Sequence, residues 1–256
     1  MFSKLDLQNL LREVQHSDGE IKRVDGRSIY PPLIEDLWSL YENVVSRKVV
    51  SIMEYGTGWS TLVLALALEH NKQFFGDFVE SNNRHPNPFC LLTVDSSRVF
   101  SNISVRRAQE FTKTKIIPVV TKSKLVEIEN RFCHVFASVP PFTADFIYVD
   151  GPDSSQVKGS IRGFHVRFGH RERKYGLPMS ADLINLEFFL WPGTTIVVDG
   201  RGANSNFLRK SLKRNWHYSY NSDTDQHFFD LIEPGWGKYS QALLALKNSK
   251  DLATDN

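Results

Sequence analysis

The chain has 256 residues, of which 41% are hydrophobic and 23% are charged. This composition is typical of a globular protein with a full core and excludes disordered, collagen-like and coiled-coil proteins. The 31 basic and 29 acidic residues leave a net charge of +2, which gives no indication of a dedicated nucleic-acid-binding protein.

The sequence favours a soluble protein that stays in the cytoplasm. No uninterrupted apolar segment stands near the N-terminus, and the longest apolar run, 62–68, is far shorter than the about 20 residues of a membrane span. The only cysteines, Cys90 and Cys133, have neither metal-site spacing nor the number needed for a disulfide framework. We therefore expect two reduced thiols and no membrane partner.

Two amphipathic helices are expected in the first part of the chain. Apolar residues recur at helical spacing over 5–15. A second helix is predicted to begin just after Pro31 and Pro32, because proline is tolerated in a first helical turn. The polar segment 16–32 between the two is expected to be a loop.

The rest of the chain alternates short apolar runs with helical segments. Strands are predicted over 49–54, 91–95, 116–120, 146–150 and 194–199, with additional strand structure over 126–136 and a closing pair at 217–220 and 227–232. Helices are predicted over 60–69, 98–113, 181–190 and 204–216, and a loop over 71–88. Such alternation indicates an α/β fold with a mostly parallel sheet, whose ligands bind beyond the carboxyl ends of the strands.

Four of the predicted strands end in a carboxylate at or near that ligand-binding edge. These residues are Glu54, Asp95, Asp150 and Asp199. A single acid at a strand end would carry little information, but four in corresponding positions form a pattern. The pattern predicts a polar ligand site along this edge.

A glycine turn follows the first of these strands, in the sequence Glu-Tyr-Gly-Thr-Gly-Trp-Ser-Thr over 54–61. Gly56 allows a tight turn, and Gly58 lets the backbone approach a ligand closely. No Gly-Lys-Ser/Thr ending follows, so the turn is not a P-loop. It is also a poor dinucleotide fingerprint, because Thr61 replaces the third glycine and Asp95 lies well beyond the about 20 residues that the fingerprint requires.

The turn resembles motif I of the class I S-adenosylmethionine-dependent methyltransferases, and the resemblance covers roughly 33–232. It includes Val-Asp-Ser-Ser at 94–97, Asp-Phe-Ile-Tyr-Val-Asp-Gly-Pro-Asp at 145–153 and Pro-Gly-Thr-Thr-Ile-Val-Val-Asp-Gly-Arg at 192–201. The implied fold is Rossmann-like, with a mostly parallel seven-stranded sheet whose last strand is antiparallel. The implied single domain comprises an N-terminal helical extension, the core and a C-terminal tail, at 1–47, 48–233 and 234–256.

The resemblance implies S-adenosylmethionine as the cofactor. Glu54, Gly56 and Gly58 would line its methionine half, and Asp95 would accept hydrogen bonds from both ribose hydroxyls, as a carboxylate can. Further candidates in the same two turns are Ser60, Thr61 and Ser96. The alternative is that the glycines form a plain tight turn and that Asp95 caps the following helix.

Asp150 and Asp199 match the positions at which cation-dependent O-methyltransferases hold a divalent cation. Mg²⁺ prefers such oxygen ligands and would lower the pKa of a bound hydroxyl. Gly200 departs from that family's usual Asp or Asn, so one ligand is missing unless water or Asp153 replaces it. Alternatively, a basic group such as Arg201 neutralises the pair, or the carboxylates orient loops or the acceptor without a metal.

The segment 156–175 is strongly basic and follows the fourth strand. Its basic residues are Lys158, Arg162, Arg167, Arg171, Arg173 and Lys174, with His165 and His170 among them. The segment is expected to lie over the reaction site and to hold an anionic acceptor. His165 or His170 is then a candidate general base, and the alternative is a solvated loop.

The sequence thus predicts an O-methyltransferase for a small polar or anionic acceptor such as a sugar or sugar derivative. Asp150, Asp199 and His165 are its candidate catalytic residues, and a homodimer is a candidate assembly. One alternative is an NAD-type oxidoreductase, which the glycine spacing and Asp95 argue against. The other is a non-catalytic cofactor- or partner-binding protein, which the lack of a clear base leaves open.

Overall fold

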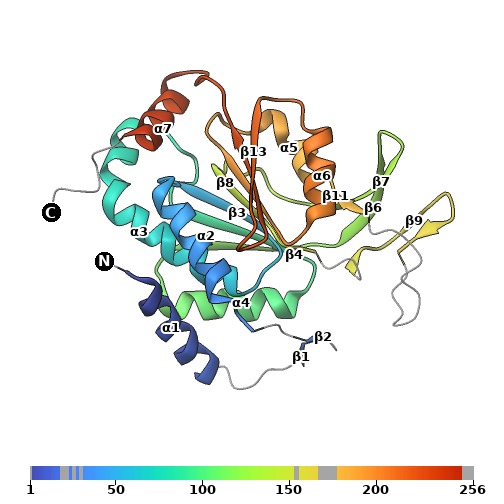
Figure 1. Ribbon diagram of the computed structural model, residues 1–256, viewed down its shortest axis with the longest axis horizontal. Coiled ribbons are helices and arrows are strands. Elements are labelled where there is room, and N and C mark those ends of the chain that lie inside the picture. Colours follow the sequence, from blue (N-terminus) through green and yellow to red (C-terminus); the bar gives the residue numbers. More distant parts are fainter. Residues whose placement is uncertain are drawn as a thin grey trace.

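A seven-stranded sheet forms the centre of the computed structural model, which describes residues 2–17, 23–24, 27–28, 31–152, 156–166 and 178–249. Its strands in chain order are β3 (Ser51–Tyr55), β4 (Cys90–Asp95), β5 (Lys115–Val120), β8 (Phe146–Val149), β12 (Thr195–Asp199), β13 (Trp216–Asn221) and β14 (Gln226–Leu231). Helices cover both faces of this sheet (Figure 1).

The strands lie in the order β13-β14-β12-β8-β3-β4-β5. The neighbours from β12 to β5 are parallel, whereas β14 runs antiparallel to both β12 and β13. The last strand of the chain, β14, therefore lies between the edge strand β13 and β12 and runs antiparallel to both. This confirms the predicted α/β fold, with a mostly parallel seven-stranded sheet whose last strand is antiparallel.

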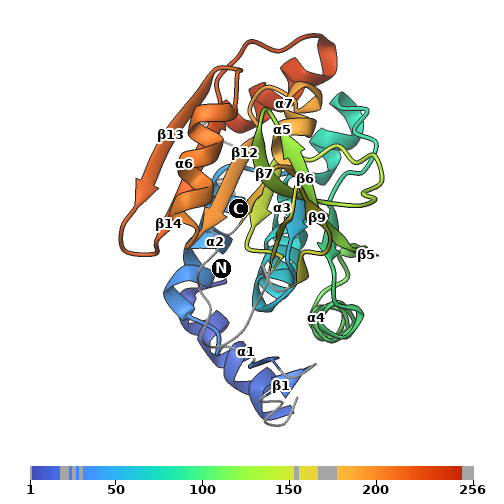
Figure 2. The same cartoon turned by 90° about the vertical axis from the view of Figure 1, so that its right-hand side faces the viewer.

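Helices from the first half of the chain cover one face. They are α1 (Lys4–Ser17), α2 (Ile34–Ser46), α3 (Trp59–Asn82) and α4 (Arg98–Phe111). Leu7, Leu11 and Val14 of α1 are buried with α2 and α3 in one hydrophobic cluster, since their spacing places them on one side of the helix. Figures 1 and 2 show α1 at the outer end of this layer, beside α2. The N-terminal segment is thus part of the core.

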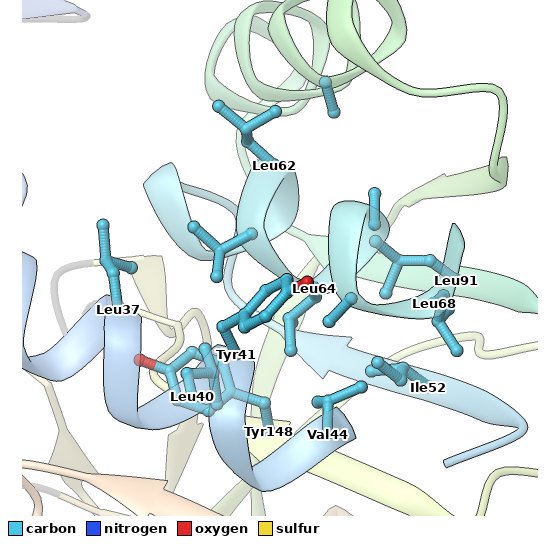
Figure 3. Packing of buried hydrophobic residues seen from close by; sticks show 14 of the residues in the cluster. Leu37, Leu40, Tyr41, Val44, Ile52, Leu62, Leu64, Leu68, Leu91 and Tyr148 are labelled. Atoms are coloured by element: carbon cyan, nitrogen blue, oxygen red, sulfur yellow. The ribbon is translucent and has the colours of Figure 1, made fainter. Parts of the chain in front are cut away.

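Figure 3 shows part of this cluster, with Leu40, Tyr41 and Val44 of α2 among side chains from α3 and the sheet. The other face is covered by α5 (Asp182–Leu186) and α6 (Gly202–Ser211). The predicted helix over 181–190 is shorter than expected, because it passes into a single 3-10 turn at Glu187–Phe189.

The predicted loop over 71–88 is wrong over 71–82, because α3 continues to Asn82, and is confirmed only over 83–88. Asn71, Phe75 and Val79 are buried along one side of this helix. The Asn71 side chain donates to the backbone oxygens of Val44 and Val49, at 3.0 and 2.9 Å. A residue type that usually marks a loop is therefore used here to bind the end of α2 and the chain that leads into β3.

The structure resolves the additional strand expected over 126–136 into two strands. β6 (Ser123–Ile128) and β7 (Arg131–Phe136) form a hairpin whose turn residues, Glu129 and Asn130, have positive φ. β11 (Met179–Ser180) pairs with β7, and β9 (Ser160–Ile161) with β10 (Phe164–His165). Within the predicted loop 16–32, β1 (Arg23–Val24) pairs with β2 (Arg27–Ser28).

The C-terminal segment contains a further helix, α7 (Lys238–Asn248), which packs against α3. Leu243 and Leu246 are buried in this contact. The Lys247 ammonium forms a buried ion pair of 2.9 Å with Asp145 at the start of β8. This end of the chain therefore contributes to the core. None of the helices described is both long and apolar enough to cross a membrane.

Candidate functional site

The glycine turn after β3 packs against the turn that follows β8. Gly56 has a φ of +92°, and a Cβ atom built on it would lie 2.6 Å from the backbone nitrogen of Gly151. The backbone N–H groups of Asp150 and Gly151 both donate to the Tyr55 carbonyl, at 2.9 and 2.7 Å. The expected tight turn is present, and glycine is required because two backbones touch there.

Gly58 is in a different situation. A Cβ atom at this position would meet nothing closer than the Ser60 hydroxyl, at 3.8 Å. Its φ of −170° is extended backbone that any residue can adopt. Folding therefore does not demand a glycine here. The space beside this backbone is what a ligand would need in order to approach it closely.

Glu54 is fully buried beneath the turn. Its two carboxylate oxygens accept hydrogen bonds from the Ser60 and Thr61 hydroxyls, at 2.6 and 2.7 Å. Burial raises the pKa of Glu54 to about 8, and these two hydrogen bonds oppose the rise. Three predicted cofactor residues are thus brought together, but they bind one another and fix the start of α3. Contact of Glu54 with a cofactor remains a prediction.

The raised pKa of Glu54 predicts how stability depends on pH. Because the folded chain holds this proton more tightly than the unfolded chain, whose carboxyl titrates near 4.5, stability is lost as the pH rises from about 4.5 toward 8. Each unit by which folding raises the pKa corresponds to about 1.4 kcal/mol. The Glu54→Gln variant lacks this titrating group and therefore this pH dependence. We expect the Tm of the variant minus the Tm of the wild type to increase as the pH is raised from 5 to 8. A Tm difference that does not change with pH would contradict the assignment.

Asp95 lies at the end of β4, adjacent to the glycine turn, and is only 7% exposed. Its Oδ2 accepts hydrogen bonds from the backbone N–H and the hydroxyl of Thr57, both at 2.9 Å. Its Oδ1 accepts one from the backbone N–H of Ser97, at 2.7 Å. The side chain that caps α4 is Ser97, through the N–H of Phe100 at 3.3 Å.

These contacts limit what Asp95 can still bind. A carboxylate oxygen accepts about two hydrogen bonds, so Oδ2 is fully used and Oδ1 retains one free acceptor position. One ribose hydroxyl fits this arrangement directly. A second would fit only if the Thr57 hydroxyl turned away, which a hydroxyl rotor can do.

Ser96, the next residue, reaches a partner from a distant part of the chain. Its hydroxyl donates to Oε1 of Gln156 at 2.5 Å. Gln156 follows β8 by only a few residues, so this contact ties the segment after β8 to the end of β4. Sequence analysis had no signal for it, because the two residues belong to different strand ends.

Asp199 at the end of β12 is bound by the neighbouring strand. The Tyr148 hydroxyl of β8 donates to its Oδ2 at 2.7 Å. Burial raises the pKa of Asp199, the hydrogen bonds from Tyr148 and Gln226 oppose that rise, and the charge of Asp225 adds to it. Neither Tyr148 nor Gln226 was predicted as a site residue, since both look like ordinary strand positions.

Asp150, one strand away, is paired with Arg201. The guanidinium Nε lies 3.8 Å from Oδ1 of Asp150. Its two remaining nitrogens donate to the backbone oxygens of Asp150 and Pro152. Desolvation by the surrounding protein raises the pKa of Asp150, the Arg201 charge opposes the rise and the Asp199 charge increases it. Because 55% of the Asp150 side chain is exposed, water screens these effects and keeps the rise in pKa small.

The contacts that the structure describes support neither the predicted metal site nor the predicted acceptor-binding role of the basic segment 156–175. Within the described ranges, no three His, Cys, Asp or Glu side chains are grouped so that they could hold a metal ion. Arg162 forms an ion pair of 2.9 Å with Glu127 on β6. His165 belongs to β10 and pairs with Ser160. Lys158 bonds through its backbone to Ser123 and Leu125 of β6. The remaining predicted residues of this segment lie outside the described residues: Arg167, His170, Arg171, Arg173 and Lys174, as does Asp153.

No family model and no curated protein matches the sequence. An O-methyltransferase from Bacillus cereus in complex with SAH is 14% identical, with a TM-score of 0.40, over 89% of this chain and 90% of that one. The O-methyltransferase TomG from Streptomyces achromogenes, in complex with SAM, is 13% identical with a TM-score of 0.40 over 88% of both chains. An SAH-bound methyltransferase from Podospora anserina is 11% identical with a TM-score of 0.46, over 91% and 89%. At these values, the likeness assigns neither a cofactor nor an activity to this chain.

Proposed function

We propose that this chain is a class I S-adenosylmethionine-dependent methyltransferase. The observation that supports it most is the convergence of three strand-end turns at one edge of the sheet. The Asp95 carboxylate holds Thr57 of the glycine turn, and Gly56 of the same turn packs on Gly151 after β8. A turn that can approach a ligand and an acid that can bind a ribose are thus fixed side by side.

The residues present fit such a cofactor. The open backbone at Gly58 leaves room for its methionine half, with Ser60 and Thr61 at the start of α3 beside it, and Asp95 keeps a free acceptor position for a ribose hydroxyl. S-adenosylmethionine, when bound, supplies a methyl group already activated by the sulfonium. The protein then needs to supply proximity, alignment and removal of a proton from the acceptor.

We propose that Asp150 and Asp199 serve the acceptor. Asp199 is held in place by Tyr148 and can orient a hydroxyl of the acceptor. Asp150 has a raised pKa, which makes it a better proton acceptor near neutral pH than an ordinary aspartate. His165 remains the alternative base. The acceptor class we propose is a small polar molecule, a sugar or sugar derivative, methylated on oxygen.

We further propose that Arg201, and not Mg²⁺, neutralises Asp150. Turnover is then expected to be the same with EDTA and with added Mg²⁺, measured as SAH release with a panel of neutral sugars and sugar acids. Arg201→Ala should lower kcat/KM at least tenfold, because Asp150 loses its opposing charge. Arg209→Ala, at an exposed position of α6, is the matched control and should leave kcat/KM nearly unchanged.

The metal alternative gives the opposite result. Loss of turnover in EDTA, with recovery in Mg²⁺ or Mn²⁺, would show that the two aspartates bind a cation and that Arg201 is not sufficient. An Asp150→Asn variant should lose more than tenfold in rate under either version, and its full activity would remove Asp150 from the mechanism.

Two other functions can be separated from this proposal. An NAD-type oxidoreductase would be stabilised against heat by NAD and not by SAH. A non-catalytic binding protein would bind SAH but release none from S-adenosylmethionine with any acceptor in the panel. A homodimer remains a prediction, which light scattering of the full chain tests.

A further inference from the structure

The segment that begins at Gln156, after β8, connects the end of β4 with β6, the strand that follows β5 in the chain. We call residues 156–158 the strap. At one end, Gln156 binds Ser96, which follows β4. At the other end, the backbone of Lys158 donates to Ser123 at 2.9 Å and accepts from Leu125 at 2.8 Å, both on β6 beyond β5. The strap is therefore anchored on both sides, and Val157 between the anchors is 4% exposed.

The strap lies in line with the cofactor site proposed above, on which this inference rests. In that site, the methionine half lies at the turn after β3 and the ribose at Asp95 after β4. In the cofactor, the adenine base is attached to the ribose on the side away from the methionine half. The strands β3, β4 and β5 are consecutive neighbours in the sheet. A cofactor that runs from the turn after β3 to Asp95 after β4 would therefore place its adenine beyond Asp95, near Ser96 and the strap.

The side-chain amide of Gln156 has hydrogen-bonding capacity left for a ligand. Its Oε1 accepts one hydrogen bond from Ser96 and can accept a second. Its Nε2 carries two hydrogens, and no partner for them occurs within the ranges that the structure describes. Ser96 thus orients the amide and leaves one acceptor position and one donor position side by side.

That pair of positions is complementary to adenine. Adenine carries a 6-amino donor next to a ring-nitrogen acceptor, and glutamine binds this pair with two hydrogen bonds. We propose that Gln156, oriented by Ser96, recognises the 6-amino edge of the cofactor's adenine and makes the site selective for adenine over hypoxanthine. In hypoxanthine a carbonyl oxygen replaces the amino group. Two acceptors, this oxygen and Oε1 of Gln156, would then face each other without a hydrogen between them.

Calorimetry with SAH and S-inosylhomocysteine tests this directly. We expect the wild type to bind SAH at least tenfold more tightly than S-inosylhomocysteine. Gln156→Ala should lower the affinity for SAH about tenfold and reduce the preference to less than threefold. Ser96→Ala, which frees the amide, should give an intermediate preference. Gln73→Ala, an exposed glutamine on α3, is the matched control and should keep the wild-type preference.

Gln156→Glu separates recognition from folding. It retains the length of the side chain and an acceptor for Ser96 but loses the amide donor, so the preference should fall while the Tm stays at the wild-type value. An unchanged preference in both Gln156 variants would overturn the role of Gln156 and leave the proposed function intact. Absence of SAH binding to the wild type would instead overturn the proposed function, and this inference with it.

Discussion

Replacing Asp95 by alanine is expected to weaken SAH binding at least tenfold. The change removes a nearly buried carboxylate whose remaining acceptor position we assign to a ribose hydroxyl. A hydrogen bond to a charged group contributes about 1.5–3 kcal/mol, and 1.4 kcal/mol corresponds to a factor of ten in affinity. The loss should exceed one such bond, because Thr57 and Ser97 also lose their common partner. Calorimetry of the full chain measures it.

The control must separate binding from stability, since Asp95→Ala also loosens two turns. Ser97→Ala removes the cap of α4, at a cost of about 1 kcal/mol, but leaves the Asp95 carboxylate in place. It should lower the Tm and keep the SAH affinity. An Asp95→Ala variant that binds SAH as tightly as the wild type would show that the ribose lies elsewhere.

Alanine at either glycine of the first turn is expected to impair SAH binding, but only the change at Gly56 should also lower the Tm. Gly56→Ala places a Cβ 2.6 Å from a backbone nitrogen, at a positive φ. Strained backbone alone costs about 1–3 kcal/mol, and at this chain length 1 kcal/mol corresponds to about 2–4 °C in Tm. We expect a fall in Tm of at least 5 °C, together with the loss of SAH binding, because Thr57 follows directly.

Gly58→Ala is expected to leave the fold unchanged and to impair only the ligand. The added Cβ meets no protein atom closer than 3.8 Å, so the Tm without ligand should stay within about 1 °C of the wild type. It would occupy the space next to the backbone where the methionine half is proposed, so SAH affinity should fall at least tenfold. Wild-type affinity in this variant would place the ligand away from the turn.

The parallel strands of the central sheet could be predicted because each is a short apolar run with a clear end. The order in which they lie could not be obtained from periodicity, and the expected antiparallel last strand came from the family resemblance. The error at 71–88 has a physical cause. Asn71 and Gly76 disfavour a helix locally, but the burial of Phe75 and Val79 outweighs that preference.

The candidate site was predictable only in part. Glu54, Asp95, Asp150 and Asp199 stand at strand ends, where a local pattern identifies them. The partners Thr57 of Asp95, Tyr148 of Asp199 and Arg201 of Asp150 come from other segments, and the sheet order decides which of them meet. Arg201 was foreseeable as a neutralising group because it lies close to Asp199 in sequence, whereas the Ser96–Gln156 contact had no sequence signal.

Titration of the wild-type chain with SAH in a calorimeter tests most directly whether the glycine turn and Asp95 form a cofactor site. We expect one SAH molecule per chain to bind with a Kd in the micromolar range or below, and NAD to give no heat under the same conditions. Binding of NAD, or no detectable binding of SAH to a folded chain, would contradict the proposed function.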